Sequence, residues 1–182
     1  YIADHFESLG LPTIGENDSY FQKVSFNRTG WKANSMEVNG KTYKHLWDYM
    51  TFATMNDHMP DFKTNEVIFL GYGIDDPMYS DYKGNDVKGK VIMINKGEPL
   101  NKDSISYITG EKKASEWTQN IWKKLAVAES KGAKMVLVIE NELKSFLDQN
   151  RRFLVSPSLE LGDGNIEDKR FANHAYISPG IA

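Results

Sequence analysis

Three short runs of apolar residues constrain the fold more than any other feature of the sequence. They lie at residues 67–74, 91–95 and 135–139, and each is continuous and rich in β-branched side chains. Runs of this kind are typical of strands that are buried on both faces of a sheet. We therefore expect these three segments to be neighbouring strands in the centre of the fold.

Residues 115–131, between the second and third runs, are predicted to form a helix. Apolar side chains recur there at helical spacing, at Trp117, Ile121, Leu125 and Ala128. Gly132 follows, where the C-cap of a helix is expected. The order strand, helix, strand is that of a crossover between two parallel strands. The sequence thus predicts a mixed α/β fold with a βαβ core.

The rest of the chain predicts shorter elements. Asn39-Gly40 lies between two short alternating runs, which favours a two-residue hairpin turn of type I′. Residues 1–11 are typical of the last turns of an amphipathic helix that ends at Gly10. Further extended segments are expected at residues 20–26, 158–161 and 175–178.

Composition excludes several classes of protein. The 182 residues carry 22 Lys plus Arg against 25 Asp plus Glu, a net charge of −3, which argues against nucleic acid as the main partner. The chain has no Cys, so disulfides, thiolate zinc sites and Cys nucleophiles are excluded together. No run reaches the roughly 18 to 20 apolar residues of a membrane-spanning helix, so we expect no membrane span.

Metal and nucleotide motifs are weak. A single dense cluster around His58, with Asp57 and Asp61, lacks the paired ligands of a zinc site, so we interpret it as a hydrated turn. Gly71-Tyr72-Gly73 ends a strand, but Asp76 stands where a dinucleotide-binding loop needs its third glycine. We interpret these glycines as allowing a bulge or a close approach of the backbone.

Two acidic segments are candidates for calcium sites. The first contains Asp163, Asn165 and Glu167 but has His174 where an EF-hand loop needs a bidentate Glu. The second contains Asp75, Asp76, Asp81 and Asp86 without matching spacing, and a weak loop-stabilising ion there stays open. No G-x-S-x-G nucleophile motif is present. We predict no catalytic residue, no metal ligand and no cofactor-binding residue in this chain.

Residues 67–141 resemble the protease-associated (PA) domain. In that family a strand ending in G-[YF]-G precedes a D-[YL]-x-G-x-D-[VL]-x-G-K-[IV] turn and strand, which residues 81–91 match. A helix of the pattern K-x-x-x-A-x-x-x-G-A follows, matched by Lys124, Ala128 and Gly132-Ala133. The resemblance implies a PA-like open β-sandwich or barrel with a βαβ core and few flanking helices.

Residues 1–22 sharpen this resemblance. YIADHFESLGL and Tyr20-Phe21-Gln22 are similar to the opening of the two-zinc aminopeptidases of metallopeptidase family 28, in which a PA domain is inserted. The resemblance implies a stub of the catalytic domain at residues 1–22 and a PA domain at residues 23–182. That domain would end at a returning helix that begins at Ser178-Pro179. We expect the chain to be a cut piece of such a protein.

The family resemblance also implies a function. The two zinc ions and their ligands belong to the catalytic domain of the parent, so this fragment should not hydrolyse peptides. A non-catalytic domain of this kind governs access of a peptide or protein substrate, or contacts of the parent catalytic domain with other proteins. The implied location is extracellular, periplasmic or in the cell envelope.

A long polar loop at residues 96–113, here named the contact loop, is our candidate contact surface. It follows the carboxyl end of a predicted strand, where open α/β sheets bind their partners. The family often has Arg-Gly-x-Cys-x-Phe here, whereas this chain has Lys96-Gly97 and no Cys. The residues chosen as candidates are Lys96, Gly97, Lys102, Tyr107 and Lys112. A surface loop without a binding role is the alternative.

A stand-alone binding module is the alternative function. Trp31, Trp47, Tyr79 and Tyr107 could form aromatic platforms of a stand-alone carbohydrate- or peptide-binding module. Aromatic side chains are also common in cores, so the sequence does not decide whether these four are exposed.

Overall fold

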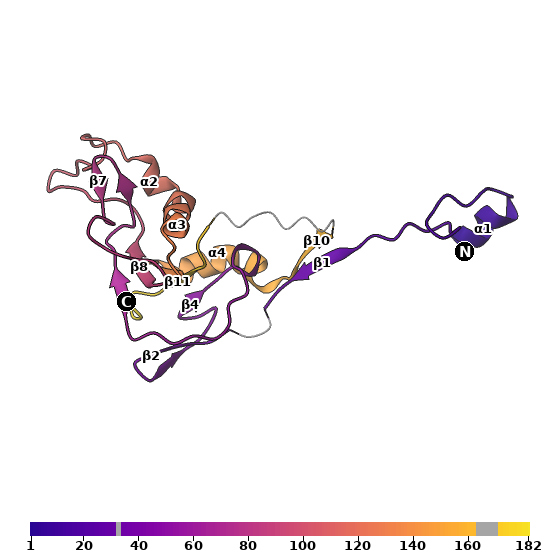
Figure 1. Cartoon of the computed structure of the whole chain (residues 1–182), viewed down its shortest axis with the longest axis horizontal. Coiled ribbons are helices and arrows are strands. Elements are labelled where there is room, and N and C mark those ends of the chain that lie inside the picture. Colours follow the sequence, from indigo (N-terminus) through magenta and orange to yellow (C-terminus); the bar gives the residue numbers. More distant parts are fainter. Residues whose placement is uncertain (32–33, 163–170) are drawn as a thin grey trace. The chain divides into compact units, whose positions relative to one another are not determined.

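The fold is described from a computed structural model, which covers residues 1–31, 34–162 and 171–182 (Figure 1). The chain forms two compact units. The smaller contains Tyr1–Thr29 together with the strand Ser158–Leu161, and the larger contains the other described elements. None of the helices in the described parts of the chain is long and apolar enough to cross a membrane.

A five-stranded sheet forms the centre of the larger unit. Its order is β4 (Tyr49–Met50), β11 (His174–Ile177), β9 (Met135–Ile139), β8 (Val91–Asn95) and β5 (Val67–Phe69). β5, β8, β9 and β11 are parallel, and β4 pairs antiparallel with β11. The fold is therefore mixed α/β, and the three apolar runs are neighbouring strands, as predicted.

The first run departs from its prediction in two ways. β5 ends at Phe69 and does not continue to residue 74, because Gly71 and Gly73 have φ values of +56° and +65° and turn the chain. β5 is also an edge strand, so Val67 and Phe69 are exposed. The expectation that this run is buried on both faces is wrong for that reason.

The crossover between β8 and β9 contains two helices, α2 (Glu116–Gln119) and α3 (Ile121–Ser130). The single predicted helix is broken at Asn120, whose side-chain oxygen accepts the backbone N–H of Lys123 at 3.3 Å and caps α3. Gly132 adopts φ +74° after α3, and the N–H of Ala133 donates to the Ala128 carbonyl, so the predicted helix end is confirmed.

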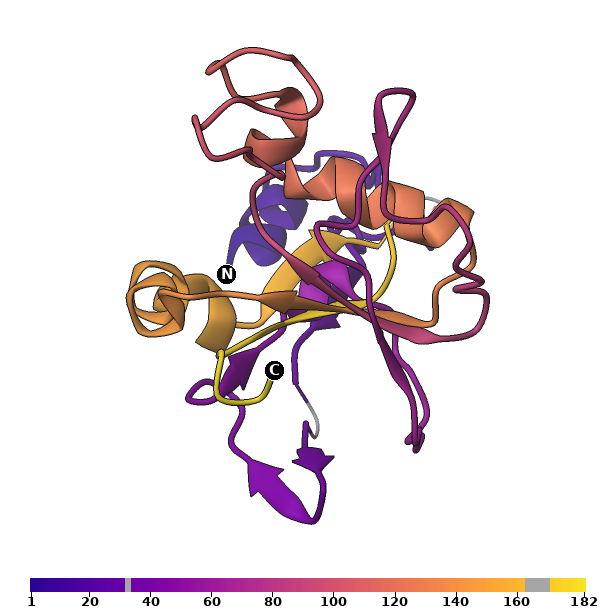
Figure 2. The ribbon, with the colours of Figure 1, turned by 90° about the vertical axis from the view of Figure 1, so that its left-hand side faces the viewer.

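α3 packs on one face of the sheet (orange in Figure 2). Its Leu125 and Ala128 belong to one buried cluster with alternate residues of the two central strands, which are Ile92, Ile94, Val136 and Val138. Met93 and Leu137, which point to the opposite face, are only partly buried. The main core therefore lies between α3 and this face.

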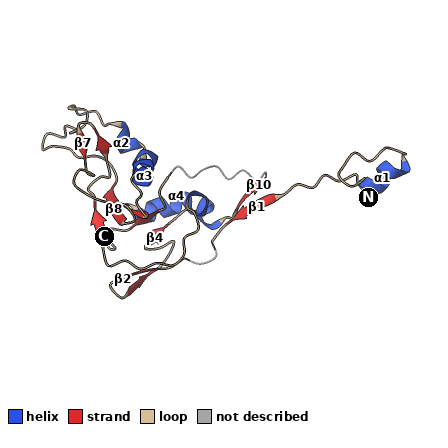
Figure 3. Cartoon of the chain, in the orientation of Figure 1, coloured by secondary structure: helices blue, strands red, loops and turns tan. Residues whose placement is uncertain are grey.

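A long helix, α4 (Leu143–Val155), follows β9 and was not predicted (blue in Figure 3). Its apolar positions do follow helical spacing, at Leu143, Phe146, Leu147 and Leu154. Leu143 and Leu154 are buried, and Phe146 and Leu147 pack against the core. Many polar residues separate these positions, so the helical spacing was not recognised in the sequence.

Short hairpins flank the sheet. β2 (Met36–Val38) and β3 (Lys41–Tyr43) pair through Asn39 and Gly40, whose φ values of +51° and +79° confirm the type I′ turn. β6 (Asp75–Asp76) pairs with β7 (Tyr79–Ser80) after the turn that ends β5. A 3₁₀ turn, η1 (Ala53–Met55), follows β4.

The smaller unit contains α1 (Ile2–Ser8) and the antiparallel pair β1 (Phe26–Thr29) and β10 (Ser158–Leu161). α1 ends as predicted, with Gly10 at φ +68°. The strand expected at residues 20–26 is wrong, because β10 pairs with Phe26–Thr29 and the preceding residues have no strand partner. No residue of Tyr1–Thr29 is buried.

Candidate functional site

The carboxyl ends of β8 and β9 form the edge that carries the contact loop. Lys96 follows β8 and Glu140 follows β9, and Lys96 Nζ lies 2.6 Å from Glu140 Oε2. The Glu140 carboxylate is nearly buried, whereas the Lys96 side chain is about half exposed. Lys96 Nζ also lies 5.3 Å from the centre of the Phe146 ring in α4. The first predicted contact residue thus joins two strands and a helix at this edge.

Lys124 in α3 is fully buried beneath the contact loop. Its Nζ donates to the Gly97 carbonyl at 2.5 Å and to the Asn95 carbonyl at 3.3 Å. Burial lowers the pKa of Lys124 to about 8, and the negative charges of Asp81 and Glu98 partly oppose that shift. Gly97, the second predicted contact residue, is therefore held to α3 through its carbonyl.

Asp81 fixes the Gly71-Tyr72-Gly73 turn. Its Oδ2 accepts the backbone N–H groups of Tyr72 at 3.1 Å and of Ile74 at 3.0 Å. Its Oδ1 accepts the Tyr79 hydroxyl at 2.6 Å. A Cβ at residue 71 would collide with this carboxylate. The glycines therefore form a turn closed by a carboxylate, and the missing side chain at Gly71 allows the close approach that was one of the two expectations.

Glu98 closes the base of the contact loop. Its Oε1 accepts the backbone N–H of Ser115 at 2.8 Å, and its Oε2 accepts the Ser115 hydroxyl. Both residues are buried. Because Glu98 lies near the start of the loop and Ser115 directly after its end, this contact joins the two ends of the loop.

Hydrogen bonds within the contact loop hold its interior. Asn101 Oδ1 accepts the N–H groups of Asp103 and Ile105, both at 2.9 Å. The N–H of Ser106 donates to the Glu111 carbonyl at 2.8 Å. The contact loop is therefore compact, with joined ends and internal hydrogen bonds.

The outer residues of the contact loop face solvent. Lys102 and Lys112 are exposed, and the Tyr107 side chain is 57% exposed. The structure describes all of residues 96–113. Backbone groups and polar side chains such as that of Asn101 form the hydrogen bonds of this loop, and the side chains of these two lysines take no part in them. Lys113, Asp103 and Glu111 are exposed as well, so the loop presents charges of both signs and an aromatic ring on a fixed support.

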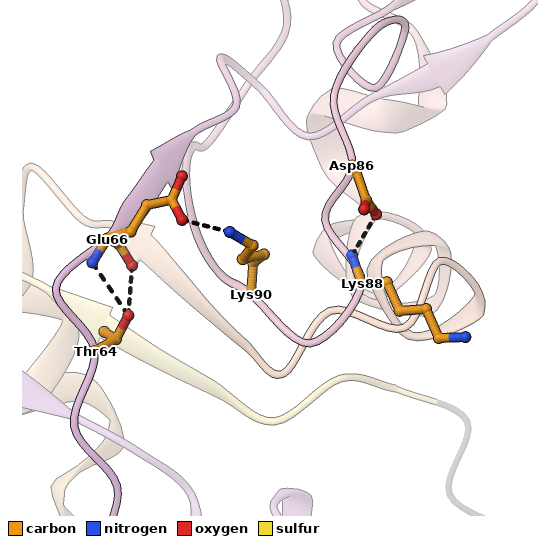
Figure 4. Close-up of polar contacts among 5 residues, drawn as sticks. All are labelled: Thr64, Glu66, Asp86, Lys88 and Lys90. Atoms are coloured by element: carbon orange, nitrogen blue, oxygen red, sulfur yellow. Dashed lines mark hydrogen bonds and ion pairs between the residues drawn. The ribbon is translucent and has the colours of Figure 1, made fainter.

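The opposite ends of the strands carry residues 86–90, which complete the turn-and-strand motif of residues 81–91 (Figure 4). Asp86 Oδ1 accepts the backbone N–H of Lys88 at 3.1 Å, and Gly89 follows with φ +71°. Lys90 Nζ then pairs with Glu66, just before β5. These residues turn the chain into β8 and lie at the amino ends of the strands, away from the contact loop.

The four aspartates weighed as a calcium site have separate partners. Asp75 pairs with Lys131 at 2.7 Å, Asp76 accepts the indole N–H of Trp117 at 3.0 Å, and Asp81 and Asp86 bind backbone N–H groups. Among the described residues, no group of three His, Asp or Glu side chains could hold a metal ion. The other acidic segment, residues 163–167, lies outside the described residues.

The four aromatic residues of the alternative function do not share one surface. Trp31 donates its indole N–H to the Leu154 carbonyl at 3.3 Å, and Trp47 lies beside the same end of α4. Tyr79 lies on β7 and is partly buried against Asp81, while Tyr107 lies on the contact loop. Only Trp31 and Trp47 are brought together, and of these Trp47 is by far the more exposed.

Comparisons with protein-family models, with curated proteins and with solved structures find no match to this chain. The site is therefore described from its own contacts. Sequence reasoning missed Glu98 and Glu140, because a lone Glu after a strand gives no signal of burial. It also missed the surface of α4, for which the helical spacing of Leu143, Phe146 and Leu147 was the available signal.

Proposed function

We propose that the chain is a non-catalytic PA domain of a family 28 zinc aminopeptidase and that the contact loop governs substrate access or protein contacts. One observation carries the proposal. Part of the PA-like motif lies beside the base of the contact loop, where Asp81 closes the Gly71-Tyr72-Gly73 turn, the Asn95 N–H donates to the Gly71 carbonyl, and Lys124 holds Gly97. The rest of the motif, at residues 86–90, lies at the opposite ends of the strands.

The finer assignments belong to the same proposal. The larger unit corresponds to a PA-like open β-sandwich or barrel, residues 1–22 to a stub of the peptidase domain, and residues 23–182 to the PA domain. Two zinc ions are expected in the parent catalytic domain and none in this chain. The parent is expected to be extracellular, periplasmic or in the cell envelope.

The contact loop suits this role for a physical reason. Its ends are joined by Glu98 and Ser115, and its base is held by Lys124, so a partner meets a surface that is already ordered. Binding to an ordered loop costs less conformational entropy than binding to a flexible one. Lys102, Tyr107 and Lys112 supply charge and aromatic area toward a peptide or a protein.

An activity assay tests the non-catalytic part of the proposal. The purified chain, incubated with excess zinc and an aminoacyl p-nitroanilide, is expected to release no p-nitroaniline above the rate of the zinc-only control. The same assay with a chelator distinguishes metal-dependent activity from contamination by other hydrolases. Robust release that the chelator abolishes and that co-purifies with the chain would contradict the proposal.

A further inference from the structure

A groove lies between the turn at residues 44–48 and one face of α4, and no residue of the contact loop lines it. Its volume is about 310 Å³, within the range of sites that hold small ligands or single side chains. Leu147, Leu154 and Val155 of α4 form its apolar lining, and Trp47 stands beside them. The Trp47 side chain is 77% exposed, the most exposed of the four tryptophans.

The turn holds Trp47 in this exposed position. Leu46 has φ +61°, a conformation that a residue with a branched side chain rarely adopts. Asp48 Oδ2 accepts the Lys44 N–H at 2.8 Å, and the Leu46 N–H donates to the Tyr49 carbonyl at 2.8 Å. Leu46 is partly buried against the core and also lines the groove, while the next side chain, Trp47, faces solvent. Residues in such strained backbone conformations cluster at active sites and ligand clamps.

Charged side chains of α4 also line the groove. Lys144, Asp148 and Arg151 are spaced by four and three residues, so they lie on one face of the helix. None of the ion pairs found in the described parts of the chain involves any of the three. Two cations with one anion between them give this face a net charge of +1, which favours a partner that brings carboxylates.

We propose that this groove docks an acidic peptide segment. One apolar side chain of the segment inserts between Trp47 and the α4 leucines, and its neighbouring carboxylates pair with Lys144 and Arg151. The apolar lining accounts for the inserted side chain, and the unpaired cations account for the acidic character of the partner. The proposal does not depend on whether the chain belongs to a peptidase.

The experiment uses the full ¹⁵N-labelled chain and the synthetic peptide acetyl-Glu-Glu-Phe-Glu-Glu-amide. Titration is expected to shift the indole N–H resonance of Trp47 and to leave that of Trp117 unchanged, since Trp117 is buried against Asp76. Arg151→Gln is expected to weaken binding by about tenfold. Arg152→Gln is the matched control, because Arg152 is the exposed neighbour that does not line the groove, and its binding should equal that of the wild type.

Several outcomes would overturn the proposal. One is a Trp47 resonance that does not move at saturating peptide. A second is equal affinity for the peptide in which every Glu is replaced by Gln, since carboxylates would then play no part. A third is a larger Trp47 shift with a neutral oligosaccharide, which would indicate a sugar platform. The last is a dimer in solution that Trp47→Ser dissociates, which would show that a second copy fills the groove.

Discussion

Lys124 places a full positive charge in the interior of the larger unit. Two backbone carbonyls accept its N–H groups, and Asp81 and Glu98 lie near enough to affect its pKa. Even so, burial dominates, and the pKa falls from 10.5 to about 8. The charge therefore fixes the start of the contact loop at a cost in stability that depends on pH.

The first prediction follows from this pKa. Below about pH 8 both the folded and unfolded chains carry the Lys124 proton, so the cost of the buried charge is complete. Between about pH 8 and pH 10 the folded chain loses that proton first, and this cost is relieved. The free energy of unfolding of the wild type minus that of Lys124→Met should therefore rise by about 2 kcal/mol across this interval.

Urea unfolding of both chains at several pH values measures this difference. Ionisation of the buried tyrosines, such as Tyr49 with a pKa raised to about 12 by burial, affects both chains alike and cancels. A difference in stability that stays flat from pH 7 to pH 10 would show that Lys124 is not buried as a charged group.

A second prediction concerns Asp81. Asp81→Asn removes the charge that accepts three hydrogen bonds, from Tyr72, Ile74 and Tyr79, and should lower the free energy of unfolding by about 2 kcal/mol. Asp86→Asn is the control, because Asp86 is exposed and binds the single N–H of Lys88; its effect should stay within about 0.5 kcal/mol. Equal losses in the two variants, measured by urea unfolding, would argue against a special role of Asp81.

At the scale of elements, the β8–α3–β9 unit was predictable because its pattern is local. Each strand is a continuous apolar run, and α3 carries its own end signal at Gly132. The strand predicted at residues 20–26 forms instead at Phe26–Thr29 (β1). Its position depends on pairing with β10, more than 120 residues later in the chain, and no local pattern contains that information.

The candidate site was predictable only in part for a similar reason. A loop at the carboxyl end of a strand follows from the fold, so the location of the contact loop could be inferred from sequence. The contacts that order it could not, because the pairing of Glu98 with Ser115 and of Lys96 with Glu140 depends on how the chain folds back on itself.

Two glycines in the segment between β5 and β8 give a third prediction. Gly73 and Gly84 both have positive φ, but a Cβ at residue 73 would lie 2.9 Å from Ile94 Cγ2, whereas at residue 84 it would meet open space. Gly84→Ala should cost about 1 kcal/mol from backbone strain alone. Gly73→Ala should cost at least about 2 kcal/mol, because it also displaces a buried strand residue. Thermal or urea unfolding that ranks the two variants in the opposite order would contradict the packing described for Ile94.

At the scale of the whole molecule, burial is divided unequally between the two units. The larger unit contains the buried cluster of the sheet, α3 and α4, while no residue of Tyr1–Thr29 is buried. A segment with few buried contacts opens at low free energy, whereas central strands open only on global unfolding.

Hydrogen exchange provides the fourth prediction. Amides of Tyr1–Thr29 should exchange within the earliest time points, and those of β8 and β9 should be the slowest in the chain. Exchange of Ser115 should also be slow, because its N–H is buried against Glu98. Protection of residues 1–29 equal to that of the central strands would show that the smaller unit is stabilised by contacts that differ from those described.

The role of the contact loop is tested most directly by kinetics of the proposed full-length peptidase. Residues 101–110 can be removed without touching the base, because Glu98, Ser115 and the Lys124–Gly97 contact all lie outside this segment. Leu100 and Glu111 both contact Ser106 in the intact loop, so the two cut ends lie close together. The ratio of kcat/KM for an oligopeptide to that for an aminoacyl p-nitroanilide is compared before and after the deletion. We predict a change of about tenfold in this ratio, the effect of losing about 1.4 kcal/mol of contact energy. An unchanged ratio for every peptide length would contradict the proposed role.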